Sequence, residues 1–224
     1  MIAMVHRYRG QLPGRRIELY AEICDVLLGH WRKAKGIQDS LTAVQKRVAL
    51  QPLAAAMMRR GLRQIGAMEA MAVMAEPLQS VNVKGEDAAS FLPDVQASSG
   101  LLQESELGEW RFAHLTLQEY LAAAHFSEHG EELNFAEWVD GSWWHETLRL
   151  YAAQSNATAL VRACLAKDTV PALSLAADCL DEARQIDIDV RQALEQKLIV
   201  DLESDDPARR KLAAEVKLHR WLSS

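Results

Sequence analysis

The stretch that most constrains the fold lies near the middle of the chain, at residues 110–124, with the sequence WRFAHLTLQEYLAAA. It reads as a short β-strand followed by a helix that opens on His114. Leu117, Leu121 and Ala124 recur at intervals of three and four residues, so we expect one face of this helix to lie in the core. Free N–H groups and the dipole at a helix start favour an anion, and a neutral imidazole there can donate to a phosphate oxygen. On residue type alone, His114 is more simply a helix-start residue packed against the preceding strand.

A β-hairpin is predicted immediately before this helix. Residues 101–104 and 110–112 have strand character and flank residues 105–108, where Gly108 supplies the turn. A wing that contacts DNA phosphates needs Lys or Arg, whereas this hairpin is acidic, which argues against duplex binding. The acidic residues are Glu104, Glu106 and Glu109.

Helical patterns surround the hairpin. Thr42 and Gln45 predict a capping box for the second of them, Pro52 predicts a kink or a split in it, and Pro77 predicts the end of the third. The order of helices followed by a hairpin is that of a winged helix. Downstream, short paired helices suggest a layer of helical repeats, with a plain helical bundle as the alternative. The predicted helices span residues 14–35, 43–60, 67–76, 86–97, 143–154, 157–167, 171–184, 189–202 and 207–222.

Charge and composition bound the class of protein. The net charge is −6 over 224 residues; residues 1–37 carry +4, which leaves −10 for the remainder and argues against nucleic acid as a partner. No run approaches the roughly 18 apolar residues of a membrane span. The N-terminus is apolar and then basic, the reverse of a secretory signal. Three cysteines without a Cys-x-x-Cys pair indicate a reduced, cytoplasmic chain with buried thiols: Cys24, Cys164 and Cys179.

Motifs of catalysis are absent from the sequence. There is no Gly-x-x-x-x-Gly-Lys-(Ser/Thr) loop to hold a triphosphate, so we expect no ATP hydrolysis by this chain alone. There is also no Gly-x-Ser-x-Gly elbow of a serine hydrolase. His125 and His129 have the spacing of zinc ligands on a helix, but no third ligand is evident. We interpret them as a surface pair and expect no metal site.

Three segments resemble one family. Residues 112–123, FAHLTLQEYLAA, resemble the Phe-x-His-x-(Thr/Ser)-(Phe/Leu)-Gln-Glu-(Tyr/Phe)-x-Ala-Ala signature in the winged helix of NACHT-type STAND NTPases. Residues 5–13 and 16–20, VHRYRGQLP and RIELY, are similar to the family's segment after the nucleotide-binding core, where its first helical domain begins. Residues 99–102, SGLL, also fit. The tryptophan pair at 143 and 144 resembles one that often follows this winged helix, although by itself it is most simply a buried anchor.

The resemblance implies a mainly α fold with a winged-helix domain and a small β-hairpin wing. It divides the chain into the end of a first helical domain at 1–40, the winged helix at 41–130 and a C-terminal, HEAT-like helical domain at 131–224. It further implies that His114 contacts the β-phosphate of ADP in the NTPase core of the same polypeptide. The residues with structural or interface roles would be Phe112, Gln118, Glu119, Tyr120, Trp143 and Trp144.

The function implied is regulatory. The parent protein would be an ATPase that binds ADP or ATP with Mg, and the exchange of ADP for ATP would free the winged helix and permit homo-oligomerisation. This chain alone would need no cofactor. The alternative is a stand-alone adaptor that binds a protein partner, which predicts an exposed apolar groove in residues 143–224. A third reading, the least supported, is DNA binding through Arg59, Arg60 and Arg63.

Overall fold

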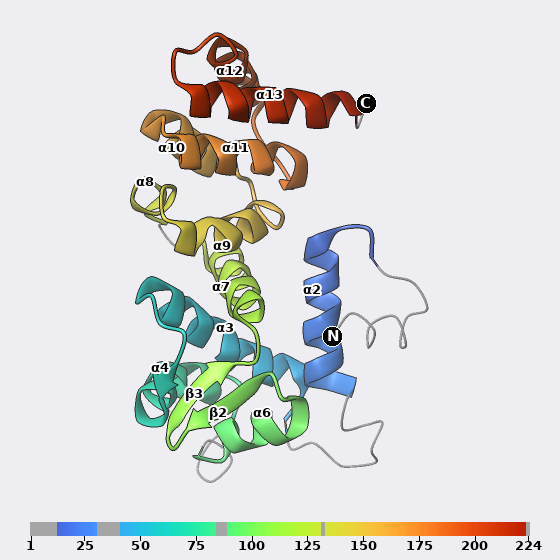
Figure 1. Cartoon of the computed structure of the whole chain (residues 1–224). Helices are drawn as coiled ribbons and strands as arrows, with labels where there is room; N and C mark the ends of the chain where they lie inside the picture. Colours follow the sequence, from blue (N-terminus) through green and yellow to red (C-terminus); the bar gives the residue numbers. More distant parts are fainter. Residues whose placement is uncertain (1–12, 31–40, 84–88, 131–132, 223–224) are drawn as a thin grey trace. The chain divides into compact units, whose positions relative to one another are not determined.

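The computed structural model describes residues 13–30, 41–83, 89–130 and 133–222. The chain divides into two compact units, Met1–His129 and Gly130–Ser224, and each is described by itself (Figure 1). Unit 1 contains α2 (Arg16–Asp25), the π-helical turn η1 (Val26–His30), α3 (Ala43–Arg59), β1 (Ile65–Gly66), α4 (Ala67–Ser80), α6 (Phe91–Ser99), β2 (Leu102–Glu106), β3 (Glu109–Phe112) and α7 (Leu115–His129). Unit 2 contains α8 (Phe135–Trp138), α9 (Ser142–Ala152), α10 (Thr158–Lys167), α11 (Val170–Glu182), α12 (Ile188–Asp201) and α13 (Pro207–Leu222). The predicted mainly α fold with a small sheet is confirmed.

The sheet of unit 1 has three antiparallel strands in the order β1-β3-β2. The predicted hairpin forms β2 and β3, in which Leu102 pairs with Phe112. The two-residue strand β1 adds to the other edge of β3, with Ile65 opposite Trp110. The N–H of Ala67 donates to the carbonyl of Gly108 over 2.8 Å, so the start of α4 is tied to the hairpin turn. A winged-helix arrangement of helices and wing results.

Helix α7 is the centre of the core of unit 1. Every side chain from Leu117 to Phe126 is buried, and the helix packs against α2, α3 and β3. The expectation that only one face of this helix lies in the core is therefore wrong. The run of alanines at 122–124 explains the difference, because small side chains let neighbouring elements approach the helix from every side.

Two prolines lie inside helices rather than at their ends. The capping box of Thr42 and Gln45 is confirmed, but α3 runs on through Pro52 without splitting. Helix α4 continues past Pro77 to Ser80, so the predicted end at Pro77 is wrong. A helical proline removes one backbone hydrogen bond. Helices in proteins are stabilised mainly by packing, and Met74 and Leu78 are buried on either side of Pro77.

The first and fourth predicted helices of unit 1 also differ from the structure. The span 14–35 is α2 followed by η1, and its remainder lies outside the described residues. Gly29 lies in the π-helical turn η1, where an added Cβ would be 3.4 Å from the Cβ of Ala43. The turn therefore approaches the start of α3 closely. The helix predicted at 86–97 is α6, with Pro93 in its first turn, where a missing N–H is tolerated. Gly100 ends it in the left-handed conformation at a φ of 63°.

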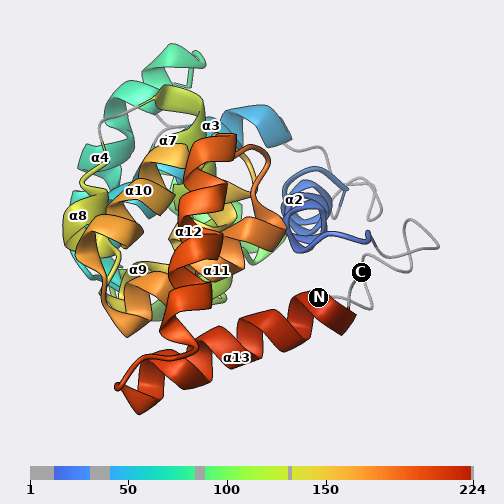
Figure 2. The same ribbon diagram turned by 90° about the horizontal axis from the view of Figure 1, so that it is seen from above.

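Unit 2 is a stack of helix pairs, and α9 to α13 begin and end within two residues of the predicted bounds, whereas the short α8 was not among the predicted helices. α10 packs on α8 and on α12, while α11 packs on α9 and on α13, so the first and second helices of successive pairs stack in the same order (Figure 2). Pro171 and Pro207 lie in the first turns of α11 and α13, as predicted. This regular stacking favours the helical-repeat interpretation over a plain bundle.

Ion pairs link the successive pairs of unit 2. Asp168 ends α10 at a φ of 53° and accepts from Arg209 and Lys197 over 2.9 and 3.0 Å. Hydrogen bonds from these two cations lower the pKa of Asp168 below its ordinary value. Lys197 also pairs with the buried Asp201 over 3.0 Å. Side chains of α12 and α13 thus hold the end of α10.

Candidate functional site

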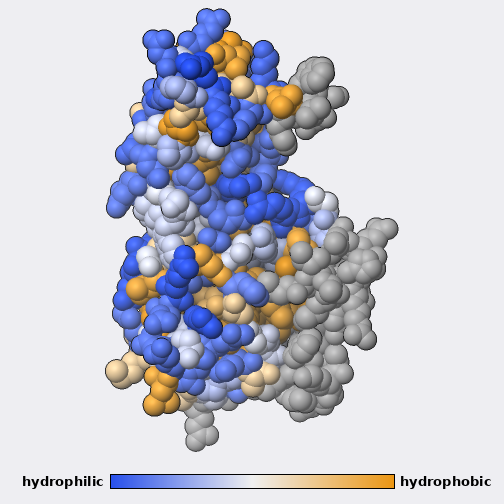
Figure 3. All heavy atoms as spheres, in the orientation of Figure 1, coloured by the Kyte–Doolittle hydropathy of each residue, from blue (hydrophilic) through white to orange (hydrophobic). Residues whose placement is uncertain are grey.

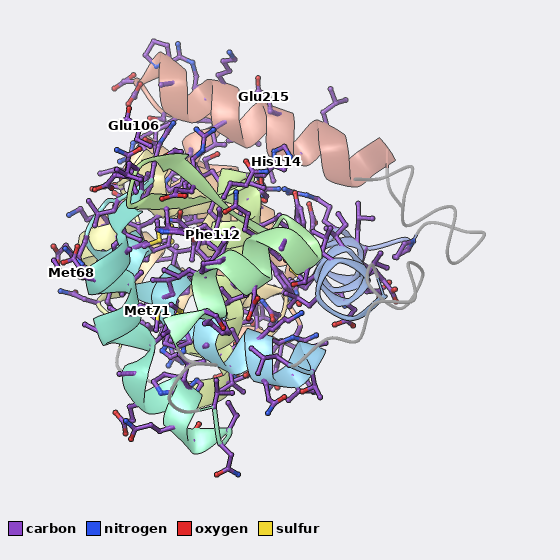
Figure 4. The ribbon with its side chains drawn as sticks, turned by 90° about the horizontal axis from the view of Figure 1, so that it is seen from below. Met68, Met71, Glu106, Phe112, His114 and Glu215 are labelled. Carbon is purple, nitrogen blue, oxygen red and sulfur yellow. The ribbon has the colours of Figure 1, made fainter. Side chains whose placement is uncertain are left out.

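The site predicted from the sequence lies where β3 passes into α7 (Figure 4). His114 immediately precedes the helix, which begins at Leu115, so the prediction that the helix opens on His114 is one residue early. The carbonyl of His114 accepts from the N–H of Leu117 over 3.0 Å and so starts the helix. Its side chain is exposed and makes no hydrogen bond or ion pair with the residues that the structure describes.

The backbone on both sides of His114 is fixed by the core. Phe112 is 4% exposed and pairs with Leu102 across the sheet. The N–H of Ala113 donates to the carbonyl of Leu101 over 2.9 Å. Since the buried part of α7 begins at Leu117, the exposed imidazole projects from a rigid junction rather than from a free loop.

Gln118 fastens α7 to the end of α3. This side chain is 1% exposed, and its Nε2 donates to the carbonyl of Leu62 over 3.0 Å. The same nitrogen also donates to the thioether sulfur of Met58, Sδ, over 3.4 Å. Gln118 therefore has a structural role within unit 1, because it satisfies a carbonyl just beyond the helix end. Glu119 is also buried, at 8% exposure.

Tyr120 packs toward α2. Its ring centroid lies 6.2 Å from that of Tyr20, and burial raises the pKa of its hydroxyl. Burial likewise raises the pKa of the neighbouring Cys24 thiol to about 12, which the charge of Arg47 only partly offsets. A thiol with this pKa is protonated at neutral pH and is a poor nucleophile. The three cysteines are free and buried, as predicted.

The histidine pair at the other end of α7 differs from its prediction. His125 is buried at 8% exposure, so the expected surface pair is wrong for this member, while His129 is exposed. The two rings stack with centroids 4.4 Å apart, and Nδ1 of His129 lies 3.0 Å from the carbonyl oxygen of His125. Across the described ranges, no group of three or more His, Cys, Asp or Glu side chains is placed to hold a metal ion.

The two neighbouring tryptophans of unit 2, Trp143 and Trp144, differ in burial. Trp144 is 8% exposed and stacks on Trp138, with centroids 3.9 Å apart and ring planes 6° from parallel. Trp143 is only half-buried. The expectation of a buried anchor therefore holds for Trp144 but not for Trp143.

The arginines considered for DNA binding make contacts within unit 1. Arg59 lies over the ring of Phe126, 5.1 Å from its centroid, and Arg60 pairs with Glu69. In the wing, the carboxylate of Glu104 accepts from the N–H of Gly108 over 2.8 Å. The hairpin thus uses an acidic side chain to close its turn, and its exposed residues include Glu104 and Glu106 against the single cation Arg111.

Comparison with known families assigns the fold of unit 1. Its helices, three-stranded sheet and hairpin wing are those of a winged helix-turn-helix domain. Residues 16–126 match the model of the winged helix-turn-helix domain C-terminal to NACHT, and this segment belongs to that family, as the resemblance predicted. A domain in this position is not the catalytic P-loop region. No curated protein and no solved structure matches the chain.

The comparison also bears on where domains begin. The match starts at residue 16, inside the span 1–40 assigned above to a first helical domain. The division into two units falls between His129 and Gly130, next to the expected boundary at 130. The three-domain division remains a prediction.

Two features of the structure were not located from the sequence. The acceptor of Gln118 is a carbonyl 56 positions away, and no local pattern marks it. The second is the position of the apolar groove between α12 and α13, which the adaptor alternative predicted only as an exposed groove somewhere in residues 143–224. No local pattern distinguishes Leu198, Ile199 and Leu202, which line the groove, from the apolar residues that are buried in the same stack. Among the described helices, none combines the length and the apolar character that crossing a membrane requires.

Proposed function

We propose that this chain is the regulatory part of a NACHT protein and couples the nucleotide state of an NTPase core in the same polypeptide to oligomerisation. In the resting state, His114 contacts the β-phosphate of ADP bound to that core. The observation that carries the proposal is the exposed, unengaged imidazole of His114 at a rigid strand-to-helix junction. Membership of residues 16–126 in the NACHT-associated family supports it.

The residues at the junction fit one side of a phosphate contact. A neutral imidazole donates through one ring N–H, and the first N–H groups of a long helix such as α7 favour an anion. The chain has no Gly-rich phosphate loop, so the β-phosphate must be held chiefly by the core. Nucleotide and Mg, when bound to the core, would supply the charge with which His114 interacts. His114 is thus a positioning and sensing contact.

The energetic scale suits a switch. A hydrogen bond to a charged group contributes about 1.5–3 kcal/mol, which changes an equilibrium constant by roughly 10- to 100-fold. A ligand shifts a conformational equilibrium only by its difference in affinity for the two states. Loss of this one contact when ADP leaves would therefore move the winged helix measurably toward the open, oligomerising state.

The test replaces His114 by Ala in the protein that joins this chain to its NACHT core. We expect the Kd for ADP to rise by about tenfold or more, and oligomers to form at lower ATP concentration, measured by calorimetry and light scattering. His129→Ala, an exposed histidine at the opposite end of α7, is the matched control and should leave both unchanged. Unchanged ADP affinity in His114→Ala would refute the role. For the chain alone, we expect no ATP hydrolysis and at most weak ADP binding.

A second candidate function is protein binding through unit 2. The apolar groove between α12 and α13 favours it, since an adaptor requires an exposed surface of this kind. This function needs no nucleotide, and it is compatible with the first because it uses different residues.

A further inference from the structure

An apolar groove opens on the last helix pair of unit 2. It has a volume of about 570 Å3. Leu198, Ile199 and Leu202 line it from α12 and the residue that follows it, and Ala213 and Val216 line it from α13. Ile199 is 58% exposed, although it is an aliphatic residue in a well-formed helix. Hydrophobic surface shows among the polar surface of these last helices in Figure 3.

The position of the groove indicates what kind of element covers it. Each earlier pair in unit 2 is covered by the next pair, as α12 and α13 cover α10 and α11. Stacks of this kind usually end in a pair with a polar outer face, which keeps them soluble. No residue of α10 or α11 lines the groove, so it lies on α12 and α13 alone. The surface continues the pattern of helix-on-helix packing, and an α-helix is the element that fits it.

The charge beside the groove indicates the composition of that helix. A second hollow of about 300 Å3 shares Val216 with the groove and reaches α11. It is lined by Asp178 and Asp181 from α11 and by Glu215 from α13. Glu215 is 64% exposed on its side chain and has only a long contact of 3.8 Å to Lys211. The charged residues that line the two hollows are four acids and one base: Glu195, Asp178, Asp181, Glu215 and Lys217. Asp178 pairs with Arg149 over 3.4 Å, so Glu215 is the carboxylate that extends most directly toward a partner.

We infer that the groove binds an amphipathic, basic α-helix of a partner protein. Aliphatic side chains at helical spacing on the partner contact Ile199 and Val216, and an Arg or Lys side chain contacts Glu215 at the edge of the acidic hollow. Apolar contact supplies most of the affinity, while the carboxylates select the sign of the partner's charge. This inference does not depend on the nucleotide contact of His114.

The test measures binding of a designed probe to the full chain. The probe is a fluorescent peptide of about 16 residues, long enough for roughly four helical turns, with Leu at i, i+3, i+4 and i+7 and Arg along one edge. Ile199→Asp should weaken its binding about tenfold, which corresponds to about 1.4 kcal/mol. Val200→Asp is the matched control, because Val200 follows Ile199 in α12, is equally exposed at 58% and does not line the groove. Its affinity should stay within about twofold of the wild type.

A charge exchange tests the acidic hollow. A peptide with Glu in place of Arg should bind the wild type more weakly than the basic peptide, and Glu215→Lys should reverse this order. Equal weakening by Ile199→Asp and Val200→Asp would show that the loss does not depend on the groove and would overturn the inference. So would the absence of basic-peptide binding, or self-association that Ile199→Asp abolishes, which would assign the groove to a second copy of the chain. Circular dichroism of each variant verifies that its helices are retained.

Discussion

The two units of this chain use helices in opposite ways. In unit 1, α7 is surrounded by α2, α3 and β3, and ten consecutive side chains from Leu117 to Phe126 are buried. In unit 2, successive helix pairs stack, and the last pair leaves Ile199 and Val200 more than half exposed. Packing on all sides of a central helix holds the ends of that helix in position. The N-terminal junction of α7 is therefore suited to position a sensing residue. A stack instead leaves an outer surface, which is suited to contact with another helix.

The largest expected effect separates the two units. Leu121→Ala opens a cavity at the centre of unit 1, where the side chain is fully buried, and should cost about 2–5 kcal/mol of unfolding free energy. Because the two units have separate cores, we expect hydrogen exchange to accelerate throughout unit 1 and to stay at wild-type rates in α11 to α13. Leu173→Ala in α11 should give the reciprocal result. If either variant loses protection in both units, the units are not independent.

An intermediate effect is expected where α7 is fastened to the end of α3. Gln118→Ala leaves the carbonyl of Leu62 without its donor and should lower the unfolding free energy by about 1–3 kcal/mol in urea titrations. Gln103→Ala is the control, since Gln103 is exposed on β2 and makes only a 3.5 Å contact to the carbonyl of Gly100. It should change stability by less than about 0.5 kcal/mol. Equal effects of the two substitutions would contradict the structural role of Gln118.

The smallest effect concerns the ion pairs of the stack and depends on pH. Arg209 and Lys197 lower the pKa of Asp168 in the folded state. The stability that this carboxylate contributes is present above its unfolded pKa of about 4 and is lost as the pH falls through the lower folded pKa. Asp168→Asn should therefore flatten the loss of stability of unit 2 on acidification, followed by urea unfolding between neutral and strongly acidic pH.

Asp205 provides the control for this measurement. It is an exposed carboxylate in the connection between α12 and α13. Asp205→Asn should leave the acid dependence of unit 2 as it is in the wild type. A wild-type profile in Asp168→Asn as well would mean that the pairs with Arg209 and Lys197 do not form in solution.

The sequence predicted the stack more accurately than the winged helix, for a physical reason. Helix starts in unit 2 are set by local signals, such as Thr169 before α11, Pro171 in its first turn and Pro207 at the start of α13. In unit 1, packing overrides local signals: α4 continues past Pro77 because residues on either side of it are buried. The local sequence around a residue does not predict which distant part of the chain packs over it.

At the candidate site too, the sequence predicted the local features but not those that depend on long-range packing. The resemblance of residues 112–123 to a family signature located His114, and the family match places that segment in a NACHT-associated winged helix. That the imidazole is exposed while Phe112 and Gln118 are buried depends on the sheet and on α3, which no local pattern specifies. Periodicity predicted a one-faced helix for α7, whereas small alanines allowed it to be enclosed.

The parallel indoles of Trp138 and Trp144 provide unit 2 with an optical signal of its own. Two such rings, with centroids 3.9 Å apart and planes 6° from parallel, are close enough for their electronic excitations to couple. Trp110, in the sheet of unit 1, has no such stacked partner among the ring contacts of the described residues. Unfolding of unit 2 should therefore appear in the aromatic circular dichroism as the loss of a coupled band. A single spectrum would then distinguish opening of the stack from opening of the winged helix.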